Sequence, residues 1–276
     1  MTRGVERFLL NPGRLPVMSS VGLVVPAYRP DVDRLASYLD SLRETVDPAS
    51  LRVELDAPDD AVSSAIAAVP PDVTVSTVPY RRGKGAAVTD GFEALDTDVL
   101  GFADADGATP AASVGAVVTA ARDGTADLAV GSRRHPGATV ESHQTPGRRY
   151  LGDGFAWLAR RLLAVDLYDY QCGAKAITAA GWRRVRQHLY EPGFAWDVEL
   201  VAIAGALDLA VTELPVRWDD RPGSTVSPVR DSLRLGRALL AARHRAKRLR
   251  DSAVHTAIAA RRERAPALVD QDAPDR

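Results

Sequence analysis

The sequence predicts an α/β protein with a mostly parallel β-sheet flanked by helices, and three observations lead to this fold class. Hydrophobic residues make up 46% of the 276-residue chain and charged residues 26%, so burial of a core can offset the entropy lost on ordering. Short apolar runs alternate with longer segments of helical periodicity, the order that builds βαβ units. Polar and glycine-rich motifs follow several of these runs, where ligands bind in such sheets.

The first strand and the first helix show how each element is predicted. Residues 21–25 form a continuous apolar run closed by a proline, which is typical of a strand buried on both faces. Leu35, Leu39 and Leu42 then recur at helical spacing, which predicts an amphipathic helix at 33–44. The elements that follow are predicted in the same way: strands at 52–55, 74–78 and 99–103, and helices at 61–68, 83–95 and 111–122.

The second half of the chain is less strongly patterned. Residues 128–130 form another apolar run, and apolar residues at 151, 155, 158 and 162 mark one face of a helix. At 214–218, apolar side chains alternate with a proline and an arginine. This pattern predicts an edge strand, because proline cannot donate a ladder hydrogen bond.

The net charge of −1 conceals a strongly basic segment near the C-terminus. The chain as a whole has 35 basic and 36 acidic residues, which argues against a generally basic nucleic-acid binder. Residues 230–264, however, carry eleven cations and three acids, a local charge of +8, beside an apolar stripe of leucines and alanines from 235 to 249. We expect a basic amphipathic helical segment that contacts an anionic membrane surface. The alternatives are a solvated helix, or one packed on the rest of the protein or on a twin subunit.

Four segments are expected along the chain: an N-terminal leader at 1–19, one domain at 20–229, the basic segment at 230–264 and a disordered tail at 265–276. The single cysteine, Cys172, excludes an intramolecular disulfide, and the leader lacks the apolar core of a signal peptide. No stretch approaches the ~20 apolar residues that span a bilayer. These features predict a cytoplasmic protein, peripheral to the membrane and without a transmembrane helix.

Two aspartates directly follow the strand predicted at 99–103. Because Asp104 and Asp106 are two residues apart at a strand end, their carboxylates point the same way and can share Mg²⁺ or Mn²⁺. A metal held by few protein carboxylates keeps open positions for substrate phosphates. Turn or capping roles are as plausible for the pair alone, and the apolar run before it favours the metal site.

A glycine-rich turn and an arginine are placed where phosphates would bind. Gly83, Lys84 and Gly85 follow a predicted strand and open a helix, where backbone N–H groups and a lysine can contact a nucleotide. A solvated turn is the alternative. Arg133 follows the strand at 128–130 at the same sheet edge, and it is either a phosphate clamp or a surface arginine.

Several motifs occur together in a characteristic order, at 24–28, 83–88, 102–109, 131–133, 171–175 and 196–200. The more specific ones are Asp-Ala-Asp-Gly-Ala-Thr at 104–109 and Gln-Cys-Gly-Ala-Lys at 171–175, and further matches extend the region to 21–237. This order resembles family 2 glycosyltransferases, and more narrowly their dolichyl-phosphate (polyprenyl-phosphate) glucosyltransferase branch.

The resemblance implies a GT-A-type (Rossmann-like) domain at 20–229 that transfers a hexose, with inversion and a divalent metal, from a nucleotide-sugar to polyprenyl or dolichyl phosphate. Glucose and UDP-glucose are the sugar and donor that fit best. Asp106 would be the main metal ligand, with Asp104. The nucleotide-sugar site would comprise Pro26, Ala27, Tyr28, Asp56, Gly83, Lys84 and Asp104. The catalytic residues would be Asp104, Asp106, Arg133, Gln171, Lys175, Asp197 and Glu199, and the acceptor phosphate would be held by Arg133, Arg148 and Arg149.

Other interpretations of these motifs stay open. The chain departs from the family pattern at 29–31, at 55–59 and at Arg81, all in the base-reading region, which leaves the nucleotide open. Residues 171–175 could be a structural turn with Cys172 in the core. Asp197 and Glu199 would point in different directions on a helix. The alternative functions are transfer from another donor or to a lipid-linked or soluble sugar, and a non-catalytic nucleotide- or lipid-binding subunit.

Overall fold

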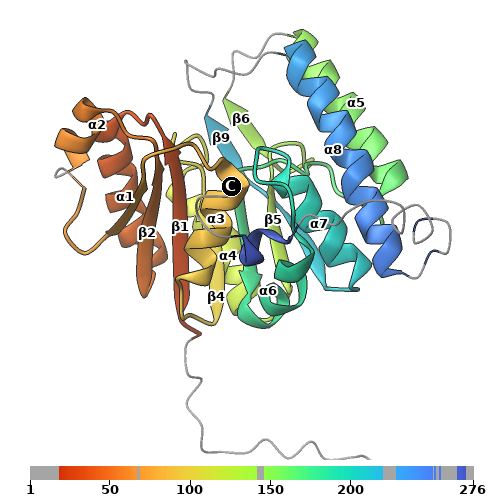
Figure 1. Ribbon diagram of the computed structural model, residues 1–276, viewed down its shortest axis with the longest axis horizontal. Coiled ribbons are helices and arrows are strands. Elements are labelled where there is room, and N and C mark those ends of the chain that lie inside the picture. Colours follow the sequence, from red (N-terminus) through yellow and green to blue (C-terminus); the bar gives the residue numbers. More distant parts are fainter. Residues whose placement is uncertain are drawn as a thin grey trace, which may run out of the picture.

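A seven-stranded sheet forms the centre of the molecule in the computed structural model, which describes residues 19–66, 69–141, 146–219, 228–250, 252, 255 and 266–271 (Figure 1). Its spatial order is β3-β2-β1-β4-β7-β5-β8. β7 runs antiparallel to both of its neighbours, and the other pairs are parallel. The strands are β1 (Val21–Tyr28), β2 (Ser50–Asp56), β3 (Thr74–Val78), β4 (Val99–Ala103), β5 (Leu128–Ser132), β7 (Ala174–Thr178) and β8 (Val211–Pro215).

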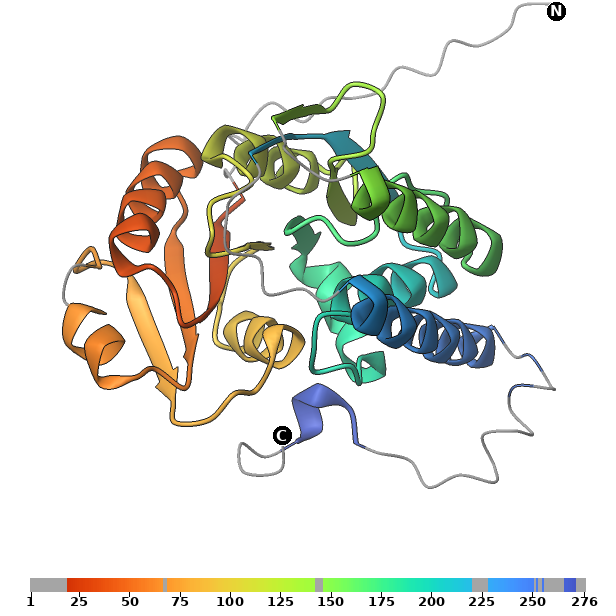
Figure 2. The ribbon, with the colours of Figure 1, turned by 90° about the horizontal axis from the view of Figure 1, so that it is seen from above.

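Helices cover both faces of this sheet and divide the hydrophobic core in two. Along β1, Leu23 and Val25 face a core shared with α1 and α4, whereas Val24 faces a core shared with α3, α6 and α7. Figure 2 shows α1 and α3 on opposite sides of the strands. The helices are α1 (Val32–Val46), α2 (Asp60–Ala65), α3 (Lys84–Glu93), α4 (Ala111–Arg122), α5 (Pro146–Leu162), α6 (Ala179–Val185), α7 (Trp196–Ala206) and α8 (Pro228–Leu249), with 3-10 turns η2 (Arg186–His188) and η3 (Leu268–Asp270).

The predicted and observed bounds agree for several elements of the first half of the chain. The segments predicted at 74–78, 99–103 and 111–122 coincide with β3, β4 and α4. α1 begins one residue earlier than predicted, because Asp31 caps it by accepting a hydrogen bond from the backbone N–H of Arg34. β7, which enters the sheet between β4 and β5, was not predicted.

The edge strand predicted at 214–218 is divided between two sheets. β8 lies at the edge of the main sheet and ends at Pro215. β9 (Arg217–Asp219) instead pairs with β6 (Thr139–Glu141) in a two-stranded sheet. Val216, between them, is buried and donates its N–H to the Ser132 carbonyl at 3.1 Å. The chain therefore changes sheet at Val216.

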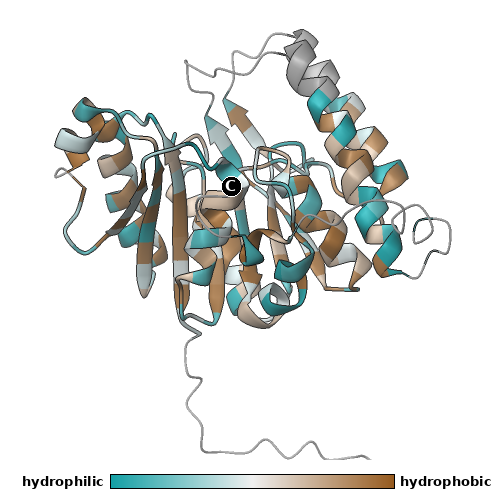
Figure 3. Cartoon of the chain, viewed as in Figure 1, coloured by the Kyte–Doolittle hydropathy of each residue, from teal (hydrophilic) through white to brown (hydrophobic). Residues whose placement is uncertain are grey.

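The apolar stripe of the basic helix packs on the protein instead of facing a membrane. α8 contacts α7 and α5, and Leu239 and Ala242 in the stripe are at most 1% exposed. This differs from the expectation that the stripe contacts lipid, because α7 offers it a hydrophobic partner within the same chain. Figure 3 shows α8 with both hydrophilic and hydrophobic residues. In the described part of the chain, no helix has the length and the apolar character needed to cross a bilayer.

Part of the tail expected to be disordered has a defined place in the structure. Residues 266–271 include η3, and Leu268 is fully buried. The backbone N–H of Leu268 donates to the Leu189 carbonyl at 2.9 Å. The apolar residues 267–269 explain the difference, since Ala267 and Leu268 bury themselves against the helical layer. The leader predicted at 1–19 lies, up to residue 18, outside the described residues.

Candidate active site

The predicted site residues gather where β1, β2 and β4 end and where β7 begins. Because β7 is antiparallel to β4, its start lies at the same sheet edge as the end of β4, and Phe102 is paired with Lys175. The first turns of α3 and α7 reach this edge and bring Lys84 and Asp197 to Asp104. The antiparallel strand therefore joins two motifs that are distant in sequence.

Four of these side chains form an alternating chain of charges, the lysine cluster: Asp104, Lys84, Asp197 and Lys175. Lys84 Nζ lies 2.8 Å from Asp104 Oδ1 and 3.0 Å from Asp197 Oδ2. Lys175 Nζ lies 2.7 Å from Asp197 Oδ1 and donates to the Cys172 carbonyl at 2.8 Å. Asp197 is 0% exposed and Lys175 2%. At this depth each charge depends on its partners, because an unpaired buried charge is strongly disfavoured.

The pairing determines the protonation of the lysine cluster. Burial opposes the charged form of Lys84, but the carboxylates of Asp104 and Asp197 outweigh it and raise its pKa above the usual value. Burial also opposes ionised Asp197, and there the ammonium groups of Lys175 and Lys84 outweigh it and lower the pKa. Lys84 and Asp197 are therefore both charged at neutral pH.

Asp104 and Asp106 differ in their surroundings although they follow the same strand. The Asp104 side chain is partly covered, with Lys84 on one oxygen. A Cβ atom built on Gly173 would lie 2.0 Å from its other oxygen, so only glycine leaves room for Asp104 there. Asp106 is exposed, and its Oδ1 accepts the Ala108 N–H at 2.9 Å. Asp106 thus presents its carboxylate at the open edge of the sheet.

These two carboxylates fit a divalent cation that is completed by a substrate. Carboxylate oxygens are the ligands that Mg²⁺ and Mn²⁺ prefer. Among the described residues, no group of three or more His, Cys, Asp or Glu side chains could hold a metal ion by itself. One or two carboxylates with phosphate oxygens and water are the usual Mg²⁺ arrangement in phosphate-binding sites. Asp106 and Asp104 are the donors that the described residues offer for it.

A second group of charges, the arginine cluster, joins the predicted Asp56 to three residues that were not predicted, Arg82, Glu54 and Asp90. Arg82 donates to Asp56 at 2.8 Å, and to Glu54 and Asp90 at 2.9 Å each. Asp56 also accepts the N–H of Gly83 at 2.9 Å, which ties it to the glycine-rich turn. Burial opposes the charge of Arg82, but hydrogen bonds to Asp56 and Asp90 raise its pKa. The available signal was Glu54, an acid two residues before Asp56 in a buried strand.

The end of β1 lies beside the arginine cluster and supplies an aromatic ring. Tyr28 is the register partner of Asp56, and Pro26 is the partner of Glu54. Ala27 is buried, whereas Tyr28 is 39% exposed. The guanidinium carbon of Arg81 lies 4.3 Å from the centre of the Tyr28 ring. An exposed ring near a fixed carboxylate is a suitable surface for a nucleobase.

Arg133 is held by a buried aspartate that sequence reasoning missed. Its Nε lies 2.7 Å and its Nη2 3.0 Å from the two oxygens of Asp169, a bidentate pair. Burial opposes ionised Asp169, but Arg133 outweighs it and holds the pKa well below the usual range. Asp169 also accepts the N–H of Gln171 at 3.0 Å. Its position two residues before the Gln-Cys-Gly-Ala-Lys string was the only signal.

Glu199 lies apart from the lysine cluster. Its Oε2 accepts the N–H groups of Tyr190 and Glu191 at 2.8 and 2.7 Å, and its Oε1 pairs with Arg245 of α8. Burial raises the pKa of Glu199, and Arg245 opposes this effect. Asp197 and Glu199 therefore point to different partners, as expected for residues two apart on a helix. Arg148 and Arg149 are in the first turn of α5, and their side chains lie outside the described part of the structure.

The sequence matches a family model and several characterised proteins. Residues 23–174, more than half of the chain, match the model of glycosyl transferase family 2. Human dolichyl-phosphate beta-glucosyltransferase is 29% identical over 264 residues, which cover 85% of this chain and 81% of that protein. The mouse enzyme of the same name is 33% identical over 61% of this chain and 53% of its own length. Glycosyltransferase AglD of Haloferax volcanii is 33% identical over 58% of this chain, a match that spans 25% of AglD.

Solved structures of lower sequence identity share the fold. Glucosyl-3-phosphoglycerate synthase from Mycobacterium tuberculosis, in complex with Mn²⁺, UDP-glucose and phosphoglyceric acid, superposes with a TM-score of 0.60. The two are 20% identical, and the match covers 82% of this chain and 80% of that one. This likeness confirms the expected GT-A-type fold class. Because the family model matches more than half of its residues, the chain belongs to glycosyl transferase family 2.

Proposed function

We propose that the protein is an inverting, metal-dependent glycosyltransferase that moves glucose from UDP-glucose to a polyprenyl or dolichyl phosphate. The observation that carries this proposal is the buried lysine cluster beside the exposed carboxylate of Asp106. It concentrates cations and carboxylates at the sheet edge where ligands bind in parallel sheets. The names of the human and mouse relatives support the acceptor and the sugar.

The donor half of the site follows from the two clusters. The exposed Tyr28 ring and the fixed Asp56 carboxylate would receive the nucleobase. The glycine-rich turn would bring Lys84 to the diphosphate. A divalent cation bound by Asp106 and Asp104 would offset the negative charge that develops on the departing nucleoside diphosphate. Lys84, already next to Asp104, adds a second positive charge there.

The acceptor half needs positioning more than it needs a base. A phosphate monoester has its second pKa near ~6, so its attacking oxygen is largely anionic at neutral pH. That oxygen forms a bond to the anomeric carbon while the bond from this carbon to the diphosphate breaks, and no proton has to be removed. Arg133, with Arg148 and Arg149, would orient the acceptor phosphate in line. Gln171 would line the side of the transferred sugar, and the buried Asp197 and Lys175 would support the site from beneath by holding Lys84.

The acceptor lipid places the reaction at a membrane surface, which the outer face of α8 suits. Its apolar stripe is covered, so contact would use the exposed Arg234 and Arg237 with the exposed Leu240. Each cation near an anionic surface contributes about 1 kcal/mol. In a flotation assay, Arg234→Ala/Arg237→Ala protein should bind vesicles containing phosphatidylserine more weakly than wild type. Equal binding would argue against this surface.

Two other functions are the alternatives to this proposal. Transfer from another donor is favoured by the departures at 29–31, 55–59 and Arg81 in the base-reading region. Transfer to a soluble or lipid-linked sugar would differ in not requiring a polyprenyl monophosphate. A non-catalytic nucleotide- or lipid-binding subunit is disfavoured by the intact pair of Asp104 and Asp106. Donor hydrolysis or transfer distinguishes an enzyme from a non-catalytic subunit, since only an enzyme turns over its donor.

A donor screen tests the proposal directly. UDP-glucose, GDP-mannose and UDP-N-acetylglucosamine are each incubated with a short polyprenyl phosphate and Mg²⁺ or Mn²⁺, and the product mass is measured. We expect a hexosyl lipid from UDP-glucose, lost on chelation and in Asp106→Ala protein. Asp123→Ala is the matched control, because Asp123 is an exposed residue at the far end of α4. Full turnover by Asp106→Ala would contradict the role of this carboxylate.

A further inference from the structure

The loop at 189–195, between η2 and α7, connects the basic helix to the glycine-rich turn. Its Pro192 carbonyl accepts the N–H of Ala86, in the first turn of α3, at 3.1 Å. A Cβ atom on Gly85 would lie 2.5 Å from the Glu191 carbonyl, so backbone packs directly on backbone at this point. Lys84 Nζ lies 5.2 Å from the ring centre of Phe194, which is 56% exposed. The loop thus forms one wall of the turn that carries Lys84.

The first half of this loop, at residues 190 and 191, is held by the buried carboxylate of Glu199. Glu199 is 1% exposed and accepts hydrogen bonds from two consecutive loop N–H groups, those of Tyr190 and Glu191. Such a carboxylate fixes the backbone in one conformation, because charge-assisted hydrogen bonds are short and strong. Removing it would leave these two N–H groups without their protein acceptor, so the loop would no longer be held in one conformation.

Arg245 of α8 completes the support from outside. It pairs with the second oxygen of Glu199, and its guanidinium carbon lies 4.7 Å from the centre of the Tyr190 ring. The same cation therefore neutralises the buried carboxylate and covers the loop that this carboxylate holds. Lys247, two residues further along α8, differs from Arg245 because it is exposed.

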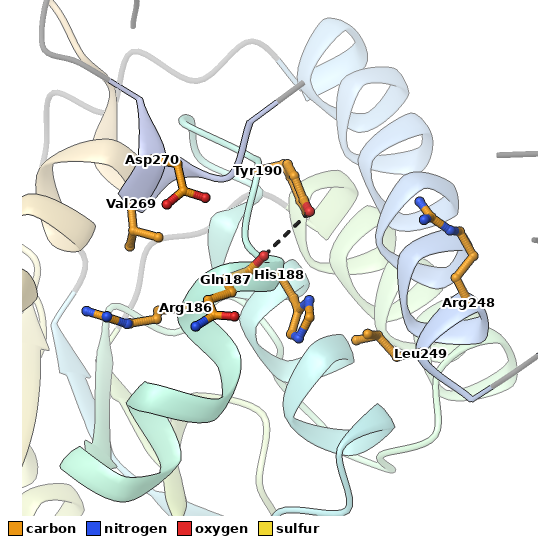
Figure 4. Close-up of a pocket in the computed structure, with 8 residues that line it drawn as sticks. All are labelled: Arg186, Gln187, His188, Tyr190, Arg248, Leu249, Val269 and Asp270. Atoms are coloured by element: carbon orange, nitrogen blue, oxygen red, sulfur yellow. Dashed lines mark hydrogen bonds between the residues drawn. The ribbon is translucent and has the colours of Figure 1, made fainter. Parts of the chain in front are cut away.

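The C-terminal segment supports the same loop at its beginning. Leu268 donates its N–H to the Leu189 carbonyl at 2.9 Å. Figure 4 shows Tyr190 between Val269 and Asp270 of this segment and the end of α8, above a pocket of about 450 Å³. α8 and the segment at 266–271 therefore both contact the start of this loop, at Tyr190 and Leu189 respectively.

We propose that Arg245 and Glu199 are positioning residues for the nucleotide-sugar, which hold the 189–195 loop against the glycine-rich turn and thereby fix Lys84. This inference rests on the proposed function for its substrate. It assigns Glu199 to the loop instead of the reacting atoms, and it makes α8 part of the donor site. The path runs from Arg245 through Glu199 and the backbone of Tyr190 and Glu191 to Pro192, and from there to Ala86.

The first test compares Arg245→Ala with Lys247→Ala, a matched loss of one cation from the same helix. Transfer is measured with a short polyprenyl phosphate in detergent, without vesicles, so that membrane attraction cannot contribute. The KM for UDP-glucose should rise about tenfold in Arg245→Ala, the effect of losing one charged hydrogen bond. The KM for the acceptor should stay within twofold, as should both constants of Lys247→Ala. Arg245→Lys should recover part of the loss, since lysine restores the charge without the planar fork.

The second test needs no substrate and separates this inference from the proposed function. Amide hydrogen exchange is followed at Tyr190, Glu191 and Ala86 in the whole protein. We expect about tenfold faster exchange at all three amides in Arg245→Ala and no change in Lys247→Ala. Glu199→Gln keeps the acceptor oxygen and should show a smaller increase, which provides a variant if Arg245→Ala folds poorly.

Clear outcomes would overturn the proposal. If Arg245→Ala and Lys247→Ala have the same donor KM, or if exchange at Ala86 is unchanged in Arg245→Ala, the two residues do not position the turn. A uniform fall in kcat together with a lower unfolding midpoint would assign Arg245 to general stability. If wild type turns over no donor, the proposed function fails, whereas faster exchange in Arg245→Ala would still support the coupling.

Discussion

The lysine cluster and the arginine cluster lie at the same edge of the sheet, but they satisfy their charges in opposite ways. In the arginine cluster one buried cation, Arg82, is shared by three carboxylates. In the lysine cluster one fully buried carboxylate, Asp197, is shared by two cations. If one carboxylate of the arginine cluster is lost, Arg82 still has two others. If Asp197 is lost, Lys175 has no other carboxylate of the lysine cluster in contact, because Asp104 contacts only Lys84.

The residue types explain what each arrangement is suited to. Arginine presents five donors in a rigid fork, so it can fix several carboxylates at once, and the arginine cluster makes a firm platform for β2 and the glycine-rich turn. Lysine is a point charge on a flexible stem and can change partners. Lys84 can therefore exchange its contact with Asp104 for a substrate phosphate. The difference predicts that the lysine cluster responds to substrate and mutation more than the arginine cluster.

The largest effect is expected from Asp197→Ala. The change leaves Lys84 and Lys175 in a buried site without their shared counter-charge. Breaking a buried pair costs about 3 to 5 kcal/mol, so urea unfolding should show a loss in this range, and transfer should fall below detection. A loss under about 1 kcal/mol would mean that water or another carboxylate replaces Asp197, and the contrast between the clusters would disappear.

Gly173→Ala is expected to have the next largest effect. Its new Cβ atom would meet Asp104 Oδ2 at 2.0 Å, so the Asp104 carboxylate must shift from the position in which its other oxygen contacts Lys84. Overpacking of this kind costs about 1 to 3 kcal/mol, and kcat should fall more than stability suggests. Gly236→Ala in α8 is the control, because a Cβ atom there meets nothing within 4 Å. It should raise stability by about 1 kcal/mol and leave kcat unchanged. If both variants keep wild-type kcat, the position of Asp104 does not matter for transfer.

Asp56→Ala is expected to destabilise the protein less than Asp197→Ala. The change removes two hydrogen bonds, from Arg82 and from the Gly83 N–H, but Arg82 keeps Glu54 and Asp90, so the loss should be about 2 kcal/mol. The affinity for the nucleotide, measured by titration calorimetry with UDP, should fall more than stability does. If Asp56→Ala destabilises as much as Asp197→Ala, the shared carboxylates of the arginine cluster are not redundant.

Sequence patterns predicted the elements whose information is local. The apolar run at 99–103 and the β-branched residues at 74–78 define their strands without help from distant residues. β7 could not be recognised, because Lys175 places a charge at the second position of a buried five-residue strand. That charge is tolerated only because Asp197, far along the chain, accepts it. The fold of the first half of the chain could therefore be predicted from the sequence. The antiparallel strand β7 could not, because its formation depends on tertiary contacts.

The candidate site was readable in its motifs but not in its pairings. The sequence placed Asp104, Lys84 and Asp197 in one site, and the structure brings them into contact. Arg82 and Asp169 were missed because an isolated arginine or aspartate carries no periodic signal. Their roles arise from partners on other strands and loops. Glu199 was predicted as a site residue, but no pattern in the sequence points to its partner, Arg245 of α8.

The smallest effect is expected at Cys172, whose backbone carbonyl accepts a hydrogen bond from Lys175 of the lysine cluster. Burial raises the pKa of the Cys172 thiol to about 11, and the negative charge of Asp169 adds to this shift. Because the folded state favours the neutral thiol, its contribution to stability is complete below the unfolded pKa of about 8.5 and is lost as pH rises through 11. At pH 8, reaction with a thiol reagent should be slow in wild type and in Asp56→Ala. The same reaction should be faster in Asp197→Ala. Without Asp197, Lys175 would no longer hold the Cys172 carbonyl in place, and the thiol would become accessible to the reagent. Equal rates in the two variants would mean that damage to either cluster exposes Cys172 to the same extent. The stability of one cluster would then depend on the other, in spite of their different pairing.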